Sequence, residues 1–225
     1  MTLEGLKEAI YVDNGLSATK LIYDYLMEEI VQLRIAPEMT ISEVKYSSAL
    51  NISRSPIRAA LDRLEDDGLI TREKGKQAIV TPLSQAEYYA MSELRMAVEG
   101  QAAYSLAYTI SDRGILELKA LLEPLNKPGK TALPYPLNDT KFHEYIIRAT
   151  QNTFLIDAYE IYRAKLLRYR NFAYKHLQLD LYGRRMRSGI HKALFYAISH
   201  HDADAARRAA VDDAVLMRMS TNLFP

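Results

Sequence analysis

The stretch from residue 41 to residue 80 most constrains the fold, because its apolar spacing and its turn residues allow few arrangements. A run of apolar residues has the i, i+3, i+4, i+7 spacing of one buried helix face: Ile57, Ala60, Leu61 and Leu64. Ser53 is the predicted N-cap of this helix, with its hydroxyl accepting a hydrogen bond from a first-turn amide. Pro56 falls in the first turn, where a missing N–H costs little, and Gly68 ends the helix. We therefore predict a helix, a tight turn, a second helix and a small two-stranded wing.

The exposed side of the second predicted helix has a pattern suited to DNA. Arg54, Ser55 and Arg58 project from a face that differs from the apolar one, all within the first turn and a half. Arginine can pair with guanine through two hydrogen bonds, serine can bond a phosphate or a base edge, and first-turn amides can receive a phosphate. The alternative is a solvated basic helix start. The preceding helix and a lysine-rich hairpin tip at residues 74–76 favour DNA binding instead.

These residues also resemble a known family. The order Asn51-Ile-Ser-Arg-Ser-Pro-Ile-Arg-Ala-Ala-Leu61, followed by Leu64-Glu65 and Asp67-Gly68-Leu69-Ile70, resembles the winged helix-turn-helix of the GntR superfamily of bacterial transcription regulators. The resemblance implies DNA contacts from the recognition helix and a wing tip, at Ser53, Arg54, Ser55, Arg58, Lys74 and Gly75. We add Lys76 at the same tip. We also add Lys45, because its neighbour Val44 stands where many relatives place a groove-contacting arginine.

Composition sets limits on the class of protein. A chain of 225 residues with 48% hydrophobic and 25% charged residues is ordinary for one or two globular domains. Cysteine is absent, which excludes a disulfide framework and thiol catalysis. We see no apolar run long enough for a membrane span and no signal-peptide pattern in the first twelve residues, so we expect a cytoplasmic protein without a membrane partner. The net charge is only +1, so DNA binding must depend on base contacts and dimerisation as well as on phosphate attraction.

Helical patterns alone follow residue 82. Ser84 with an acidic residue three positions later is a capping box, which predicts a long helix to about residue 108. Further helices are predicted at 112–125, 137–150, 153–177, 181–199 and 202–221, with one long loop from residue 126 to residue 136. We therefore predict a mainly α protein, with a winged helix-turn-helix DNA-binding domain at 1–82. An all-helical bundle for effector binding and dimerisation follows at 83–225.

Four ligand-type side chains converge in the predicted bundle. Asp139 and His143 are four residues apart and share an inward helix face. His191 lies on another apolar face, and Asp213 is as far beyond Asp202 as His191 is before it. If the last two helices fold back at Asp202, that pair lies level. A divalent metal would satisfy all four groups, and mixed nitrogen and oxygen ligands allow zinc, manganese, nickel or iron. The alternative is that each is an ordinary buried polar residue with a local hydrogen bond.

The helical half is similar to the FadR-type effector domain, called FCD. The matching segments are Leu94-Arg95 with Glu99 and Ala102-Ala103, Asn138-Asp139 with Phe142-His143, Gln151-Asn152, His191 to Ile198, and Asp202 to Ala206. The resemblance implies that Asp139, His143 and His191 hold a metal ion, with Asp213 where the fourth ligand is usually histidine. It favours the metal-containing, VanR-like subgroup and a small carboxylate effector such as a sugar acid, a hydroxy acid or a dicarboxylate.

Arg95 is the predicted effector clamp, because a guanidinium can hold a carboxylate that also reaches a metal. The alternative for Arg95 is a structural salt bridge to Glu99 at i+4. The whole sequence thus predicts a ligand-responsive regulator, expected to be a repressor, that binds a palindromic operator as a homodimer. One alternative is a regulator whose helical half only dimerises. The other is a metal-dependent enzyme, which is disfavoured because no base or nucleophile motif accompanies the ligands, so we predict that the chain is not an enzyme.

Overall fold

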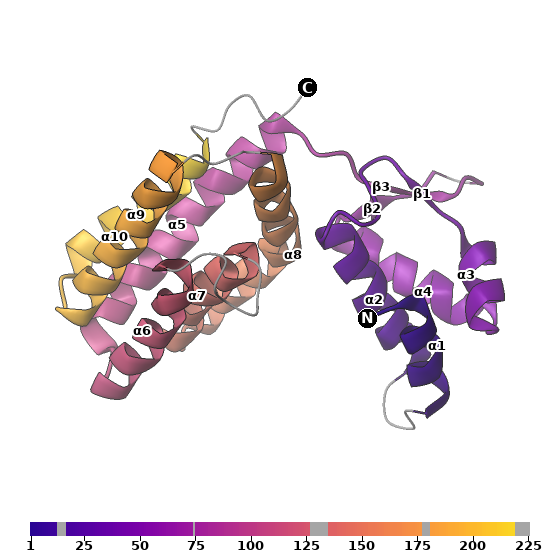
Figure 1. The fold of residues 1–225 in the computed structure, drawn as a ribbon, viewed down its shortest axis with the longest axis horizontal. Coiled ribbons are helices and arrows are strands. Elements are labelled where there is room, and N and C mark those ends of the chain that lie inside the picture. The colour runs from indigo at the N-terminus through magenta and orange to yellow at the C-terminus, as the bar shows by residue number, and fades with distance from the viewer. Residues whose placement is uncertain (13–16, 74, 127–134, 177–180, 219–225) are drawn as a thin grey trace. The chain divides into compact units, whose positions relative to one another are not determined.

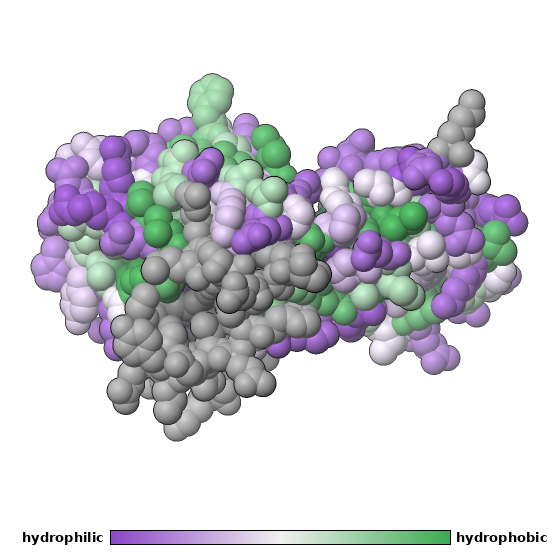
Figure 2. Space-filling model, turned by 90° about the horizontal axis from the view of Figure 1, so that it is seen from above, coloured by the Kyte–Doolittle hydropathy of each residue, from purple (hydrophilic) through white to green (hydrophobic). Residues whose placement is uncertain are grey.

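The computed structural model describes residues 1–12, 17–73, 75–126, 135–176 and 181–218, which are mainly helical as predicted (Figure 1). The chain divides into two compact units, Met1–Leu83 and Ser84–Pro225. Among the described residues, no helix combines the length and apolar character that crossing a bilayer requires. Hydrophilic side chains cover much of the face seen in Figure 2, with smaller apolar areas between them.

The first unit contains four helices among its described residues. They are α1 (Leu3–Val12), α2 (Ala18–Val31), α3 (Glu43–Leu50) and α4 (Arg54–Asp66). Helix α2 begins at an N-cap serine, Ser17, whose hydroxyl accepts from the Lys20 amide at 3.2 Å. The apolar face of α4 predicted from the sequence is buried, and α4 packs on both α2 and α3. The unit's core therefore fixes α4 and leaves its opposite face exposed.

Gly68 ends α4 as predicted. Its φ of +66° is a left-handed conformation, which glycine adopts without a Cβ clash. The Gly68 amide donates to the Glu65 carbonyl at 2.8 Å and the Leu69 amide donates to the Leu64 carbonyl at 2.9 Å. These two bonds form a Schellman motif, which satisfies carbonyls that the helix end would otherwise leave open.

The predicted two-stranded wing is present at residues 70–80, and a third strand that the sequence does not predict joins its sheet. The strands are β1 (Thr40–Ile41), β2 (Ile70–Thr71) and β3 (Ala78–Val80), in the antiparallel order β1-β3-β2. Ile41 pairs with Ala78, and Ile70 pairs with Val80. Strand β1 is too short to show the alternation of buried and exposed residues by which a strand is predicted. It ties the residues before α3 to the wing.

The second unit is an all-helical bundle. Its described helices are α5 (Gln85–Thr109), α6 (Asp112–Asn126), α7 (Tyr135–Ala149), α8 (Thr153–His176), α9 (Leu181–Ser199) and α10 (Ala203–Arg218). Helix α7 begins two residues before its predicted start, and most of the predicted loop lies outside the described residues. Helices α9 and α10 fold back on each other, and α10 also packs along α5 (Figure 1). The Asp202 carboxylate caps α10 by accepting from the Ala205 amide at 2.9 Å.

Ser84 caps α5 as predicted, with its hydroxyl accepting from the Glu87 amide at 3.1 Å. The sequence also predicts an inner stripe on α5 made of Leu94, Ala97, Val98, Gln101, Ala102 and Leu106. Half of this stripe is wrong, although Val98, Ala102 and Leu106 are buried. Leu94, Ala97 and Gln101 are exposed, whereas Arg95 and Glu99 are buried. When the buried face of a helix is predicted from its apolar residues, the charged residues are assigned to the exposed face. Here the two charges neutralise each other one helical turn apart, which permits their burial.

Candidate functional site

The predicted DNA contacts that the structure describes are all exposed on the first unit. Ser53, Arg54, Ser55 and Arg58 are all exposed at the start of α4, opposite the buried face. Gly75 has a φ of +80° at the turn between β2 and β3, and Lys76 is exposed beside it. We call the described members of this set the recognition surface: Lys45, Ser53, Arg54, Ser55, Arg58, Gly75 and Lys76. Lys74, also predicted to contact DNA, lies outside the described residues.

Ser53 is the N-cap residue of α4, but its side chain makes no capping hydrogen bond, which corrects the sequence prediction. A serine cap bonds the amide of the second or third helical residue. The third helical residue here is Pro56, which has no N–H. The Ser53 hydroxyl and the first-turn amides therefore have no capping bond to each other, and helix-start amides of this kind can receive a phosphate.

The cations of the recognition surface differ in their partners. Arg58 forms two contacts with Glu43 of α3, from Nη2 to Oε2 at 2.9 Å and from Nε to Oε1 at 3.3 Å. Lys76 pairs with Glu73 at 2.5 Å. Within the described part of the chain, Arg54 and Lys45 form no ion pair. A groove of about 290 Å³ lies between the wing and α3–α4, lined by Glu43, Arg58, Gly75 and Lys76 among others.

The second unit buries a group of charged and imidazole side chains between its helices. They come from α5, α7, α8, α9 and α10, and each is at most 8% exposed at the side chain. We call them the charge cluster: Arg95, Glu99, Asp139, His143, Arg170, His191 and Asp213. The structure thus brings together all four residues that the sequence predicts as metal ligands.

The two imidazoles face each other at the centre of the cluster. Nε2 of His143 lies 3.2 Å from Nε2 of His191. The His191 nitrogen lies 3.0 Å from Oδ1 of Asp139 and 3.5 Å from Oδ1 of Asp213. The His143 nitrogen lies 3.4 Å from Oδ2 of Asp213 and 3.9 Å from Oδ1 of Asp139. Two nitrogens and two carboxylates therefore converge on one small volume.

These separations fit a shared metal ion. Ligand atoms that bind one ion at about 2.1 Å lie roughly 3.0–3.4 Å apart in common geometries. Most of the observed separations fall within or close to this range. Without an ion, a proton on Nε2 of His191 would satisfy the same contacts by donating to Asp139. The donor set therefore fits a divalent metal and also permits a metal-free network.

Each converging group is held from behind by a further charged residue. Nδ1 of His143 donates to Glu99 at 3.0 Å, which leaves its Nε2 lone pair facing the centre. Nε of Arg170 donates to Oδ2 of Asp139 at 2.9 Å. Nη2 of Arg95 donates to Oδ2 of Asp213 at 2.8 Å. Such outer contacts orient metal ligands, whereas Nδ1 of His191 has no hydrogen-bond partner among the described residues.

Neighbouring charges hold the pKa of each carboxyl group in the cluster below its ordinary value. Burial raises the pKa of Glu99, but the Arg95 guanidinium and His143 outweigh it and hold this pKa below its ordinary value. Burial likewise acts on Asp139, where Arg170 and the histidines hold the pKa well below its ordinary value. The pKa of Asp213 is lowered against burial by His143, His191 and Arg95. A metal ion binds imidazole in its neutral form, so around a bound ion three carboxylates and two guanidinium groups would leave an excess of one negative charge.

Arg95, the predicted effector clamp, has its guanidinium engaged inside the cluster. Nε and Nη2 donate to the two Glu99 oxygens at 2.8 and 2.9 Å, and Nη2 also reaches Asp213. These are the contacts of the structural salt bridge that the sequence leaves open as the alternative. The link to Asp213 on α10 adds a third member to that pair.

Arg170 is a cluster member that the sequence analysis does not identify. It is buried, and its Nη1 donates to the Thr140 hydroxyl at 3.0 Å. A signal was available, because Arg170 follows Tyr159, Tyr162 and Leu166 at helical spacing on the buried face of α8. An arginine on an apolar stripe indicates a buried partner.

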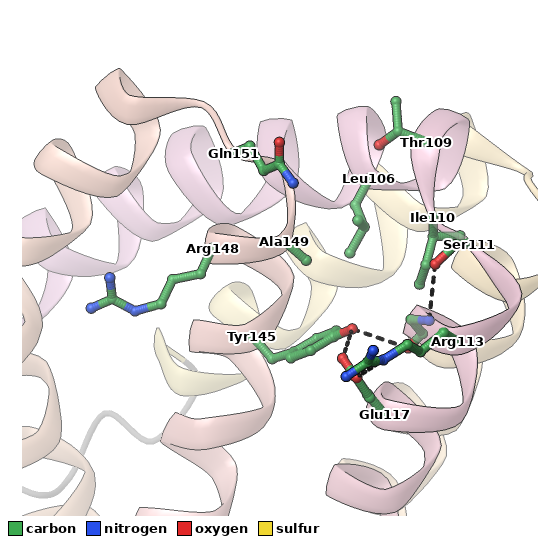
Figure 3. Close-up of a pocket in the computed structure, with 11 residues that line it drawn as sticks. Leu106, Thr109, Ile110, Ser111, Arg113, Glu117, Tyr145, Arg148, Ala149 and Gln151 are labelled. Carbon is green, nitrogen blue, oxygen red and sulfur yellow. Dashed lines mark hydrogen bonds and ion pairs between the residues drawn. The ribbon is translucent and has the colours of Figure 1, made fainter.

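A surface pocket of about 340 Å³ lies elsewhere in the second unit (Figure 3). It is formed by the end of α5, the start of α6 and the end of α7. Its charged groups already bind one another, since Arg113 pairs with Glu117, and the Tyr145 hydroxyl donates to Glu117 at 3.0 Å (Figure 3). Arg148 pairs with Glu144 on its own helix. The charge cluster is the stronger candidate for a ligand site, because four side chains of metal-ligand type converge in it.

Comparison with known proteins agrees with both units. Residues 18–80 match the model of the bacterial regulatory proteins of the gntR family, and residues 90–213 match the FCD domain. The HTH-type transcriptional repressor RspR of Escherichia coli is 27% identical over 190 residues, covering 84% of this chain and 82% of RspR. The gluconate operon transcriptional repressor of Bacillus licheniformis is 28% identical over 118 residues, covering 52% of this chain and 48% of that protein.

The fold is also that of a solved structure. Escherichia coli McbR/YncC superposes with a TM-score of 0.71 at 17% identity, covering 89% of this chain and 94% of that one. The related families are transcription regulators and not enzymes, which agrees with the absence of a base or nucleophile motif in the sequence. The chain therefore belongs to the GntR family of bacterial transcription regulators and carries an FCD effector domain.

Proposed function

We propose that this regulator is a repressor that binds a palindromic operator as a homodimer and responds to a small carboxylate effector held with a divalent metal. The observation that carries the effector part is the convergence of the buried side chains of Asp139, His143, His191 and Asp213. The recognition surface supports the DNA part, and the named relatives RspR and the gluconate operon regulator are repressors.

On DNA, α4 would enter the major groove with its first turn foremost. Arg54, which has no ion pair among the described residues, would bind phosphate or a base edge. The Ser53 hydroxyl and the uncapped amides of α4 would receive a phosphate. One unit offers few cations, and the whole chain has a net charge of only +1. Two copies on a palindrome would double these contacts, which supports a dimer.

In the bundle, Asp139, His143, His191 and Asp213 would hold the metal ion. A bound divalent ion with an open position supplies a Lewis-acidic partner for a carboxylate or hydroxyl oxygen. The mixed ligands do not separate zinc, manganese, nickel and iron. The charges support a carboxylate effector. Three carboxylates, two guanidinium groups and one divalent ion, with neutral imidazoles, would give the cluster a net charge of about +1. One carboxylate of an effector would neutralise that charge.

Buried polar atoms near the cluster could complete the effector site. Nη2 of Arg170 and the hydroxyls of Tyr159 and Tyr162 have no hydrogen-bond partner among the described residues. Buried polar groups normally form hydrogen bonds, so these three donors suit a polar ligand, although Nη2 of Arg170 also lies 4.0 Å from Oε1 of Glu99. Arg95 remains a proposed effector contact, although a ligand there would share the guanidinium with Glu99 and Asp213. Effector binding would then favour one of two states with different DNA affinity.

The second candidate function is a regulator whose bundle only dimerises. The salt bridge of Arg95 to Asp213 favours this reading, because Asp213 already has a cationic partner. A proton on His191 would then satisfy the centre of the cluster.

One experiment separates the two candidates. The metal content of the purified protein is measured by elemental analysis, and a panel of sugar acids, hydroxy acids and dicarboxylates is screened for a shift in melting temperature. We expect bound metal in the wild type, its loss in His143→Ala, and its retention in His200→Ala, which removes an exposed histidine of the same unit. The active compound should also change the operator affinity in a gel-shift assay. Equal metal content in wild type and His143→Ala would remove the ligand assignment and leave the dimerisation-only regulator.

A further inference from the structure

Arg58 is an exposed arginine of the recognition surface, and it is paired with a carboxylate, that of Glu43. Its guanidinium and the Glu43 carboxylate meet side by side, through Nη2 and Nε on one side and both carboxylate oxygens on the other. The partners lie on consecutive helices, fifteen residues apart, so the pair is not a product of helical spacing. Two-point contact fixes the plane of the guanidinium as well as its position.

The geometry leaves one edge of Arg58 available. A guanidinium has five N–H donors in a planar fork, and the contacts with Glu43 use the edge formed by Nε and Nη2. The edge formed by Nη1 and Nη2 can still donate two parallel hydrogen bonds. That is the pattern by which arginine binds O6 and N7 of guanine in the major groove.

Exposure shows which partner would face the DNA. The Arg58 side chain is 62% exposed, whereas the Glu43 side chain is 25% exposed. Both line the groove between the wing and the helices, so the carboxylate lies behind the guanidinium rather than in front of it. Arg54 and Lys45 have no such partner among the described residues, which suits them to mobile phosphate contacts.

We propose that Glu43 is a positioning residue that fixes Arg58 for reading a guanine, and so helps to set operator specificity. This inference depends on the proposed role of Arg58 as a DNA contact. Prior fixing of the side chain reduces the conformational entropy lost on binding, and it penalises bases that the fixed edge does not match. Glu43 itself repels phosphates, so it lowers the affinity for DNA of any sequence.

This role predicts two opposite effects of Glu43→Gln, which keeps the size of the side chain and removes its charge. The preference for guanine at one position of each half-site should fall about tenfold, within the range expected when a bidentate contact is weakened. The affinity for unrelated DNA should rise about twofold, because a negative charge has left a phosphate-facing surface. A residue that only joins α3 to α4 would instead lower the melting temperature and weaken binding to all DNA.

The test uses the full-length protein and a pool of random duplexes, from which bound sequences are selected and counted. The variants are Glu43→Gln, Arg58→Ala, the double variant, and the matched control Glu73→Gln. The control removes another carboxylate that pairs with a cation of the same surface, Lys76. Melting temperatures are measured for all variants. Affinity for one selected operator and for one unrelated duplex is then measured at a single salt concentration.

We expect Arg58→Ala to abolish one guanine preference, Glu43→Gln to weaken the same one, and the double variant to match Arg58→Ala. Glu73→Gln should raise non-specific affinity without changing any base preference. If Arg58→Ala removes the preference while Glu43→Gln leaves it intact, the positioning role is overturned and Arg58 remains a DNA contact. If Arg58→Ala changes no base preference, the proposed contact itself fails, and the inference fails with it.

Discussion

The recognition surface and the charge cluster both contain arginine–carboxylate pairs, but they place them in different surroundings. Arg58 and Glu43 meet at the surface beside a groove, whereas Arg95, Glu99 and Asp213 meet inside the bundle. An exposed arginine can exchange water for a ligand at little cost. A buried arginine cannot leave its carboxylates without exposing an unpaired charge to a medium of low polarity. Burial thus makes a change at Arg95 costly to the fold, whereas Arg58 can bind a partner at little cost.

The largest expected effect tests this separation at Arg95. Replacing Arg95 with methionine leaves Glu99 and Asp213 buried with reduced compensation. We expect the free energy of unfolding to fall by about 3–5 kcal/mol, the usual cost of breaking a buried pair. Urea denaturation followed by circular dichroism measures this change.

The control is Arg113→Met, which removes an i, i+4 partner of the same chemical kind at Glu117. The Arg113 side chain is 88% exposed, and we expect no measurable change in the unfolding midpoint. If Arg95→Met unfolds like wild type but no longer responds to an effector, the buried Arg95 does not stabilise the fold as proposed. Arg95 would then be the effector clamp predicted from the sequence.

The next largest effect is expected at Arg54, on the exposed side of the comparison. Arg54→Ala should lower the affinity for a selected operator by at least roughly tenfold, since a specific arginine contact discriminates by about that factor. The unfolding midpoint should not change, because Arg54 has no ion pair among the described residues. Gel-shift titration checks the affinity, with Lys119→Ala as an exposed cation of the other unit. An unchanged affinity would remove α4 from the DNA interface.

The two regions also differ in how far the sequence predicts them. The capping, apolar face and ending of α4 lie within twenty contiguous residues, so local rules place all but one feature. The exception is the capping hydrogen bond predicted for Ser53, which is absent. Pro56 has no N–H to donate at the third helical position. The charge cluster depends on five helices. The spacing of Asp139 and His143, and the fold-back at Asp202, predict that four members meet.

The remaining members are set by packing between distant segments. Arg170 meets Asp139 from another helix, and Glu43 meets Arg58 across a turn. Nothing in the local spacing of either pair identifies its partner. Glu99 was identified only as a partner of Arg95, because its contact with His143 depends on how α5 packs against α7. A single sequence therefore predicts faces of helices better than it predicts which faces meet.

A smaller effect is expected at Asp213, because replacing it with asparagine removes one negative charge and keeps the shape of the side chain. Asp213→Asn keeps one oxygen that can accept from Arg95 and makes the cluster neutral when both imidazoles are neutral. We expect the affinity for a divalent metal to fall about tenfold, as when other groups around a metal site are altered. Competition with a chelating dye measures the change. An affinity equal to wild type would show that Asp213 is a partner of Arg95 alone.

The smallest effect is expected at Glu87, whose half-buried side chain is intermediate in burial between the exposed Arg58 and the buried Arg95. Lys165 donates to its carboxylate at 2.9 Å and the Tyr169 hydroxyl donates at 2.7 Å. Burial raises the pKa of Glu87, but these two hydrogen bonds outweigh it and lower the pKa below the ordinary value of 4.5. A lowered pKa stabilises the fold above the unfolded-state value, and this stability is lost as the pH falls through the folded-state pKa.

Glu87→Gln should therefore be less stable than wild type at neutral pH, by about 0.5 kcal/mol because solvent screens a pair of this exposure. The difference should shrink as the pH falls below 4.5, since the wild type then loses the charge that the variant lacks. Urea denaturation at a series of pH values measures both curves. Curves that stay parallel into acid would mean that the carboxylate charge contributes nothing here. In that case an ion pair would contribute measurably to stability only where it is fully buried, as at Arg95.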